Sequence, residues 1–496
     1  MNPTVNDDVP QTYLLLFTVL PEAIIETMLA PLVPFLIRSL SADVPADQLE
    51  AAIGGRSGLF AGMFYLPLLF TSIIWGTLSD ILGRKPILLI GLLFSGITTF
   101  VLGINNSSFA IALLCRFFAG VFGSNSIVAK GALGEIHTDE KGRSWAYSAY
   151  GSLYAISGIM GPLIGGLLVD SNAVKDISDV KKSYPYFNAC LFGTVLTAVS
   201  IPITIQYFHE PKFLKRRHSK VDSTLTEAVE NESILINGET LDNETQHRAL
   251  STHFRELFSI SGMARLYTSL CEPMTAKSMF PISLYVLIAF CNMSWSVLLP
   301  LLFATSPNLG GLGFTPFDSS FAMTLAAISK LFFQTLFCER IVLGVGPNGA
   351  YRVGMAVVIP ASVFVGILGG SFGGSGVSWW ITMICMIMFG FVEAIAYLSS
   401  ILMISDSVPA SSLGAAHGLA ATCAALVRTI APTLSGYVWE FASVRVNKPW
   451  FAFVIVEIVA AFAVFVAWKG SVSVTRREYM SLENDIELHL TQSISI

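Results

Sequence analysis

Long apolar stretches separated by short polar segments run along most of the chain. A helix needs about 20 mostly apolar residues to cross about 30 Å of hydrocarbon. Twelve stretches reach about this length, with approximate cores at 12–38, 56–78, 86–104, 109–130, 145–169, 187–208, 281–303, 317–338, 350–370, 377–404, 413–440 and 450–469. The pattern predicts an all-α membrane protein with twelve transmembrane helices.

The longest polar interruption, residues 209–280, divides these stretches into two groups of six. It contains the basic run KFLKRRHSK followed by charged and small residues without apolar periodicity, a composition typical of disordered linkers. We therefore expect an N-terminal six-helix bundle over 12–208, a cytosolic, disordered linker and a C-terminal six-helix bundle over 281–469. Residues 1–11 and 470–496 are then cytosolic tails.

Composition changes the picture by excluding whole classes of protein. Of 496 residues, 53% are hydrophobic and only 13% are charged, whereas soluble domains are about one quarter charged. A water-soluble enzyme is therefore excluded. The net charge of −5 without a concentrated basic patch argues against a nucleic-acid partner. The seven cysteines show no C-x-x-C spacing, so we expect no disulfide framework and no cysteine metal cluster. The histidines in the loops show no ligand spacing either, and we expect no metal site and no cofactor.

Lysine and arginine are more frequent on the side of the membrane that holds the N-terminus, even when the linker is left out of the count. Basic residues concentrate on the cytosolic side of membrane proteins, so both tails are expected in the cytosol. The opening MNPTVNDDVP has no basic residue before the first apolar stretch. We therefore expect a retained first helix rather than a cleaved signal peptide.

The turn between the second and third stretches reads GTLSDILGRKP and ends with Pro86 at the start of the next helix, a favoured position for proline. The string resembles the signature loop of the major facilitator superfamily. The matching positions are Gly76, Asp80, Gly83, Arg84 and Lys85. The resemblance implies that Asp80 and Arg84 form a charge network that locks one conformation of a cytosolic gate. Ile81 stands where the family often has a basic residue, so part of that network is missing.

Two further strings resemble motifs of the same superfamily. Arg116 begins RFFAGVFG in the fourth stretch, which is similar to a motif whose intramembrane arginine serves proton coupling. The fifth stretch carries SGIMGPLIGG, similar to the antiporter motif of drug and tetracycline exporters. Its key positions are Gly158, Gly161, Pro162, Gly165 and Gly166. Small residues let helices approach closely and proline bends a helix, so ordinary packing is the alternative interpretation of this string.

An internal repeat indicates duplicated halves. The string GPLIGG at 161–166 recurs as APTLSG at 431–436, an offset of 270, and residues 28–32 correspond to 298–301 at an offset of 269. The resemblance therefore implies two pseudo-symmetric six-helix bundles, the major facilitator fold. The string PEA at 21–23 and the eleventh stretch, with GAAHGLA, resemble the zinc-induced facilitator-like and tetracycline-resistance-like branch.

Ionisable residues inside the first half are candidates for proton coupling. Such a residue costs about 2.5–3.5 kcal/mol near the bilayer centre, so it must pair or line a wet cavity. A rise of 1.5 Å per residue places Glu22 near the midplane, Glu26 one turn further, and Arg116 at a depth similar to that of Glu26. We expect Glu26 and Arg116 to pair, and Glu22 or Glu26 to carry protons; the alternative is a purely structural ion pair.

Ionisable residues inside the second half form a second candidate set. Lys330 and Glu393 lie at similar depth by the same rise, so we expect them to pair. Arg428 is placed to bind an anionic group of a substrate, or alternatively to pack against Glu457. We expect a structural or solvated role for His417 rather than metal binding.

These features, with the resemblance, imply a secondary transporter that moves a small organic solute by alternating access. We expect proton-coupled antiport, out of the cytosol or into an organelle, by a chain that functions as a monomer. A uniporter, and a receptor or scaffold without transport activity, are the alternatives. No nucleophile–base pairing within the apolar stretches suggests an enzyme. The membrane is expected to be vacuolar, another endomembrane or the plasma membrane.

Overall fold

The computed structural model is helical wherever it describes the chain, and no strand occurs in that part. The described residues are 5–45, 48–123, 125–137, 140–170, 184–210, 276–365, 376–408, 413–446 and 448–470. The predicted linker and C-terminal tail fall almost wholly outside these ranges.

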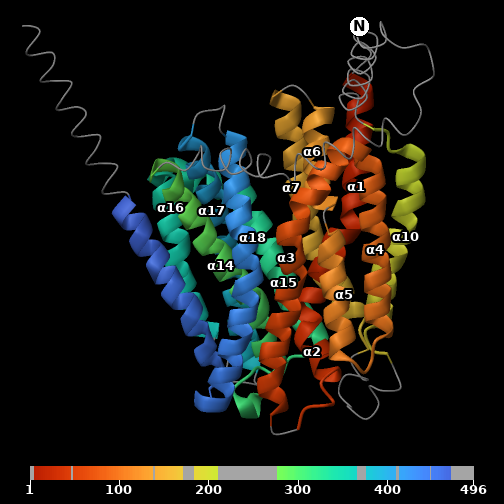
Figure 1. Cartoon of the computed structure of the whole chain (residues 1–496). Helices are drawn as coiled ribbons and strands as arrows, with labels where there is room; N and C mark the ends of the chain where they lie inside the picture. The colour runs from red at the N-terminus through yellow and green to blue at the C-terminus, as the bar shows by residue number, and fades with distance from the viewer. Residues whose placement is uncertain are drawn as a thin grey trace, which may run out of the picture.

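The helices of the N-terminal half follow the first six apolar stretches (Figure 1). They are α1 (Val5–Leu29), η1 (Ala30–Leu32) and α2 (Val33–Ser39), which together form the first span, then α3 (Leu49–Leu82), α4 (Arg84–Ile104), α5 (Phe109–Phe122), α6 (Asn125–Ile136), α7 (Glu140–Leu168) and α10 (Phe187–Tyr207). The fourth apolar stretch, predicted as one helix, is thus divided between α5 and α6.

The helices of the C-terminal half follow the last six stretches. They are α14 (Ala276–Ala304), η2 (Pro307–Leu309), α15 (Pro316–Leu336), α16 (Cys338–Val363), α17 (Gly376–Asp406), α18 (Leu413–Phe441), the π-helical turn η5 (Ala442–Val446), η6 (Pro449–Phe453) and a last helix over 454–470.

Eleven spans in the described part are long and apolar enough to cross a membrane. The remaining predicted span, α15, which is the eighth apolar stretch, has the same 21-residue length as α4, but Asp318, Lys330 and several serines lower its mean hydropathy. It packs against α7, α16 and α17, so its polar side chains are sheltered from lipid by neighbouring helices. Each of the twelve predicted stretches therefore forms helix in the part of the chain that the structure describes, as a multi-pass membrane protein requires.

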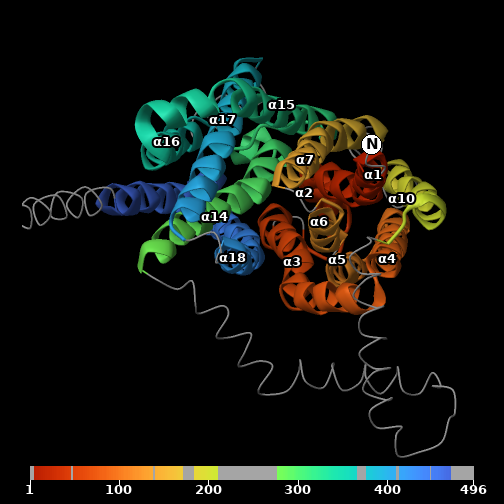
Figure 2. The same cartoon turned by 90° about the horizontal axis from the view of Figure 1, so that it is seen from above.

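The two halves stand side by side and meet along two helix pairs. Figure 2 shows α3 beside α18, and α7 beside α15, and these pairs make the main contacts between the halves. The start of α1 and the end of the last helix lie at the same end of the molecule (Figure 1). We call this the termini end, and the other the opposite end.

Glycine makes the equivalent turn in each half. Gly83, between α3 and α4, has φ of 100°, and Gly346, which kinks α16 near its start, has φ of 74°. Only glycine adopts such angles without strain. Each glycine turns the chain between the second and third spans of its half, which supports the duplication indicated by the repeat.

The hydrophobic core of the N-terminal half is split into two levels along α1. Leu15, Val19 and Ala23 belong to a cluster toward the termini end, and Met28 and Leu32 belong to a second cluster toward the opposite end. The polar residues of α1 occupy the level between them. The fold therefore places ionisable side chains at mid-depth without interrupting either core.

Candidate functional site

A pocket inside the N-terminal half brings together the charged residues that the sequence singled out there. It lies among α1, α3, α4 and α5, and we call it the acidic pocket. Its lining residues are Glu22, Ile25, Glu26, Leu29, Phe64, Ser95, Thr98, Thr99, Leu102, Cys115, Arg116, Ala119 and Gly123. Glu22 and Glu26 are one helical turn apart, so α1 presents both carboxylates on one face.

The expected ion pair between Glu26 and Arg116 is not formed, although both residues line the pocket. Tyr65 donates a hydrogen bond of 2.6 Å to Glu26 Oε1. The Arg116 guanidinium instead lies over two rings, 5.1 Å from the centroid of Phe60 and 4.8 Å from that of Phe64. Cation–π contacts of this kind are favourable within about 6 Å. Tyr65 thus takes the place at Glu26 that we predicted for Arg116.

The end of the acidic pocket around Glu22, one helical turn from Glu26, has polar groups without hydrogen-bond partners in the described part of the chain. Glu22 Oε2 is buried, and no described group forms a hydrogen bond with it. Asn125, at the start of α6, is fully buried beside the Glu22 carboxylate, and neither polar atom of its side chain forms a hydrogen bond of ordinary geometry within the described part of the chain. It packs so closely on Gly91 that an added Cβ there would lie 2.1 Å from Asn125 Oδ1. Sequence reasoning missed Asn125; its signal was a polar residue within an apolar stretch.

The C-terminal half holds an ion pair at mid-depth. Lys330 Nζ of α15 lies 2.5 Å from Glu393 Oε1 of α17, and both side chains are about one third exposed. The structure therefore brings together the two residues that the depth argument paired. Each neutralises the other in a region where a single charge would be costly.

Arg428 of α18 faces the N-terminal half. Its guanidinium lies within electrostatic reach of Tyr65 and Glu26 across the boundary between the two halves, which we call the gap, and of Tyr397 within its own half. The residue is half-buried, and its Nε has no partner among the described residues. Glu457 is not among the groups that influence Arg428, so the alternative contact with Glu457 is not observed.

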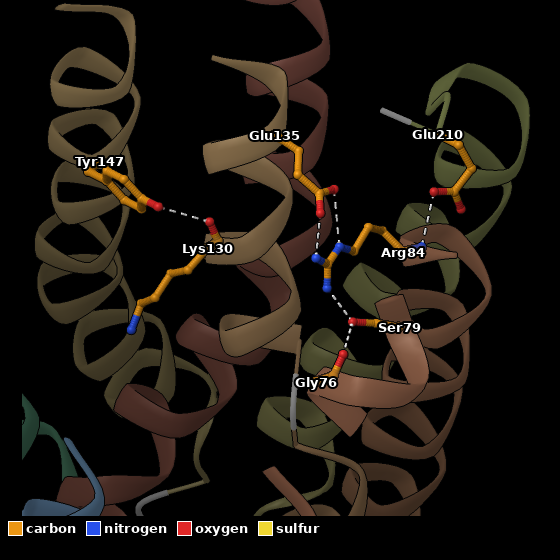
Figure 3. Close-up of polar contacts among 7 residues, drawn as sticks. All are labelled: Gly76, Ser79, Arg84, Lys130, Glu135, Tyr147 and Glu210. Atoms are coloured by element: carbon orange, nitrogen blue, oxygen red, sulfur yellow. Dashed lines mark hydrogen bonds and ion pairs between the residues drawn. The ribbon is translucent and has the colours of Figure 1, made fainter. Parts of the chain in front are cut away.

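Lys130 of α6 is a charged residue near this gap that sequence reasoning did not select. Its side chain is exposed, and its ammonium lies 5.2 Å from the ring centroid of Tyr150. Figure 3 shows the side chain extending away from Arg84. The ammonium is also close enough to Arg428 for the two charges to repel.

Arg84, predicted as a gating residue, is the centre of a polar network at the termini end (Figure 3). Its guanidinium donates to Glu135 Oε1 at 2.7 Å and to the hydroxyl of Ser79. Its backbone N–H donates to Glu210 Oε2 at 3.0 Å. This network ties the α3–α4 turn to α6 and to the segment after α10.

Glu210 also accepts a 2.7 Å hydrogen bond from the backbone N–H of Lys85, and so caps the start of α4. A carboxylate at that position is favourable because the first N–H groups of a helix lack intrahelical partners. Lys85 Nζ donates to the carbonyl of Ile205 at 2.6 Å. The backbone of Asp80 belongs to α3, but its side chain lies outside the described part of the chain. Gly76 has open space around it.

The glycine motif of α7 serves two helix contacts. An added Cβ at Gly161 would lie 2.1 Å from Thr27 Oγ1, and one at Gly165 would lie 2.9 Å from the carbonyl oxygen of Met28, so both glycines face α1. Pro162 lies inside α7 between them. The Thr27 hydroxyl donates to the carbonyl of Ser157 at 2.8 Å.

The other two glycines of the motif face α15 in the second half. An added Cβ at Gly166 would lie 2.6 Å from Ser320 Cβ, and one at Gly158 would lie 3.5 Å from Ala327 Cβ. Gly436, which the repeat relates to Gly166, makes the matching contact between α18 and α3, where it meets Gly58. The offset of 270 therefore relates two contacts that join the halves.

The halves touch most closely at the opposite end. An added Cβ at Gly58 would lie 2.4 Å from the carbonyl oxygen of Pro432. Arg38 pairs with Glu50 at 2.7 Å and also donates to the carbonyl of Ala304 in the second half at 3.4 Å. Toward the termini end, Gly76 of α3 and Gly418 of α18 have nothing within 4 Å of an added Cβ. The contact between α3 and α18 is thus tight at one end only.

Comparison with known proteins agrees with this architecture. The sequence model of the Major Facilitator Superfamily matches residues 15–432. Protein ZINC INDUCED FACILITATOR 1 of Arabidopsis thaliana is 24% identical, over 90% of this chain and 89% of its own. The class H tetracycline resistance protein of Pasteurella multocida is 28% identical, over 38% of this chain and 42% of its own.

Solved structures share the fold. The human organic anion transporter MFSD10 (TETRAN) superimposes with a TM-score of 0.59 at 17% identity, covering 94% of this chain and all of that one. A D-xylose-proton symporter superimposes with a TM-score of 0.63 at 11% identity, covering 92% of this chain and 96% of its own. The resemblance noted in the sequence is confirmed, and the class is transporter rather than enzyme. The chain belongs to the Major Facilitator Superfamily and is a multi-pass membrane transporter.

Proposed function

We propose that the chain exchanges a small organic solute for protons by alternating access, with Glu22 and Glu26 carrying the protons. The observation that supports this most directly is the acidic pocket. It holds two carboxylates, one helical turn apart, between two hydrophobic cores. Ionisable residues inside membrane spans are typical of proton relays and ion pathways in transporters.

Arg428 provides a link between the two halves in this proposal. It lies within electrostatic reach of Glu26 across the gap, so a rocking movement of the halves changes the distance between the two charges. The attraction between the guanidinium and the carboxylate therefore changes with the conformation.

The gate of this proposal lies at the termini end, which we place in the cytosol. The network around Arg84 and Glu135 holds the α3–α4 turn against the rest of the N-terminal half. The close contact of Gly58 with Pro432 and Gly436 closes the opposite end. A conformation closed at the opposite end, with α3 and α18 apart toward the termini end, fits one step of alternating access.

Purified protein in liposomes tests the coupling. The liposomes contain a pH indicator, and the panel of added organic solutes includes tetracycline, because a relative is named for resistance to it. We expect at least one solute to drive proton movement and to move faster when a pH gradient is imposed. Glu22→Gln and Glu26→Gln should each remove the response to the gradient.

Glu457→Gln is the matched control, because Glu457 lies in the last helix and does not line the acidic pocket. It should leave coupling intact. Solute movement that is indifferent to the gradient, in the wild type and in both pocket variants, would instead identify a uniporter. Solute binding without any movement would identify a receptor or scaffold.

A further inference from the structure

We propose that the transported solute carries both an anionic and a cationic group. The anionic group binds between Lys130 and Arg428, and the cationic group binds at the Glu22 end of the acidic pocket. This inference rests on the proposed exchange for protons and names the class of solute that the same site would take.

The basic side of the site holds two cations, and in the described part of the chain only Arg428 has a carboxylate, that of Glu26, within electrostatic reach. Lys130 has an exposed side chain, and no carboxylate pairs with it in the described part of the chain; its nearest partner is the ring of Tyr150. Arg428 has a buried Nε without a hydrogen-bond acceptor. The two side chains belong to different halves and are close enough to repel. A solute anion placed between them would remove the repulsion and fill vacant donor positions.

The acidic side has the complementary property. The charged and titratable groups that face Glu22 are Glu26 on its own helix and two tyrosines, Tyr150 and Tyr154, on α7. Arg116 lines the same pocket, but its guanidinium lies over the rings of Phe60 and Phe64, and Glu22 Oε2 has no hydrogen-bond partner in the described structure. A proton or a solute ammonium can satisfy this carboxylate, and each excludes the other.

Exchange for protons selects between the classes of solute. An anion alone would repel the nearby carboxylates, because like charges repel, and would therefore enter together with protons rather than in exchange for them. A cation alone would displace a proton from Glu22 but would leave Lys130 and Arg428 facing each other. A zwitterion displaces the proton with its ammonium and neutralises the basic pair with its anionic group.

Aromatic pairs on both halves provide walls for the solute's apolar part. Tyr150 and Tyr154 of α7 have ring centroids 5.1 Å apart, and Tyr285 of α14 and Tyr397 of α17 have centroids 5.7 Å apart. Tyr150 lies under Lys130, and Tyr397 lies within reach of Arg428. We therefore expect a compact apolar body between the two charged groups.

The test measures binding of nine probe compounds to purified protein by thermal stabilisation. Each of three skeletons is offered as a zwitterion, as the amine alone and as the acid alone: phenylalanine, phenethylamine and 3-phenylpropionate; tryptophan, tryptamine and indole-3-propionate; leucine, isoamylamine and 4-methylpentanoate. For at least one skeleton, we expect the zwitterion to bind about tenfold more tightly than its amine or its acid.

Variants assign each preference to its residue. Lys130→Gln should reduce the affinity for the zwitterion to about that for the amine and leave the affinity for the amine unchanged. Arg428→Lys should lower the affinity for the zwitterion less than Arg428→Gln does. Glu22→Gln should lower the affinity for the zwitterion and for the amine, but not the affinity for the acid. Lys448→Gln is the matched control, because Lys448 also lies over a ring, that of Trp450 at 5.8 Å, but at the opposite end.

Two outcomes would overturn the inference. In one, none of the nine compounds stabilises the protein at millimolar concentration; in the other, every amine binds as tightly as its zwitterion. The assay uses a single buffer without a gradient, so it does not depend on proton movement. Zwitterion binding without gradient-driven flux would count against antiport alone, and gradient-driven flux without zwitterion selectivity would count against the solute class alone.

Discussion

The contact between Gly58 of α3 and the α18 backbone offers a direct test of alternating access. The substitution Gly58→Ala adds one methyl group where its Cβ would lie 2.4 Å from the carbonyl oxygen of Pro432 and 2.9 Å from Gly436 Cα. These are backbone atoms, which cannot rotate away as a flexible side chain could. The two helices must therefore move apart at the opposite end.

The size of the effect follows from the geometry. An ordinary van der Waals contact begins at 3.4 Å, so α3 and α18 must separate by about 1 Å. Overpacking of this kind costs about 1–3 kcal/mol. Because the clash exists only while the opposite end is closed, that energy disfavours this conformation relative to the alternative. An energy difference of this size changes a conformational equilibrium by about 5–150-fold.

The assay measures the distance between α3 and α18 at the termini end by pulsed electron paramagnetic resonance. Spin labels are attached at Gly76→Cys and Gly418→Cys, where an added side chain meets open space, in a cysteine-depleted background. Gly58→Ala should transfer population toward shorter distances, because opening one end closes the other. Gly151→Ala, also in open space, is the control. A distance distribution unchanged by Gly58→Ala would refute the reasoning.

Three further predictions concern other parts of the molecule. Glu210→Gln should lower the free energy of unfolding by about 0.5–2 kcal/mol, measured by thermal unfolding in detergent, because the charged cap of α4 is lost. Asn125→Leu should preserve folding but remove gradient-driven transport, whereas an inert packing role predicts unchanged transport. The Arg56 guanidinium holds the pKa of Asp43 below its usual range, so Asp43→Asn should lower the melting temperature at pH 7. That difference should disappear as the pH falls through the lowered pKa, because the protonated carboxyl no longer attracts Arg56.

The sequence was sufficient for the features that depend on length and repetition. The length of each apolar stretch predicted a helix, and the division of the fourth stretch after Phe122 is the main departure. The offset of 270 related Gly166 to Gly436 before either contact was known. Such features are predictable because the bilayer fixes the length of a span and because a duplicated sequence packs in a duplicated way.

Polar partners inside the bundle were harder to predict, because depth along a helix does not determine direction around it. A rise of 1.5 Å per residue gives the height of a side chain, whereas each residue also turns the helix by about 100°. Lys330 and Glu393 had similar predicted depths, and α15 and α17 turn them toward each other. Glu26 and Arg116 also had similar predicted depths, yet Tyr65 lies at the Glu26 carboxylate.

The same reasoning explains why the acids around Arg84 escaped prediction. The signature loop contributes Ser79 and Arg84 from positions 5 residues apart, but Glu135 and Glu210 come from segments 51 and 126 residues away. A guanidinium and the free N–H groups of a helix start both require acceptors when they leave water. That requirement predicts that carboxylates must be present, although not which ones. Choosing among acids at the termini end requires the packing of α6 and α10 against the turn, which the structure provides.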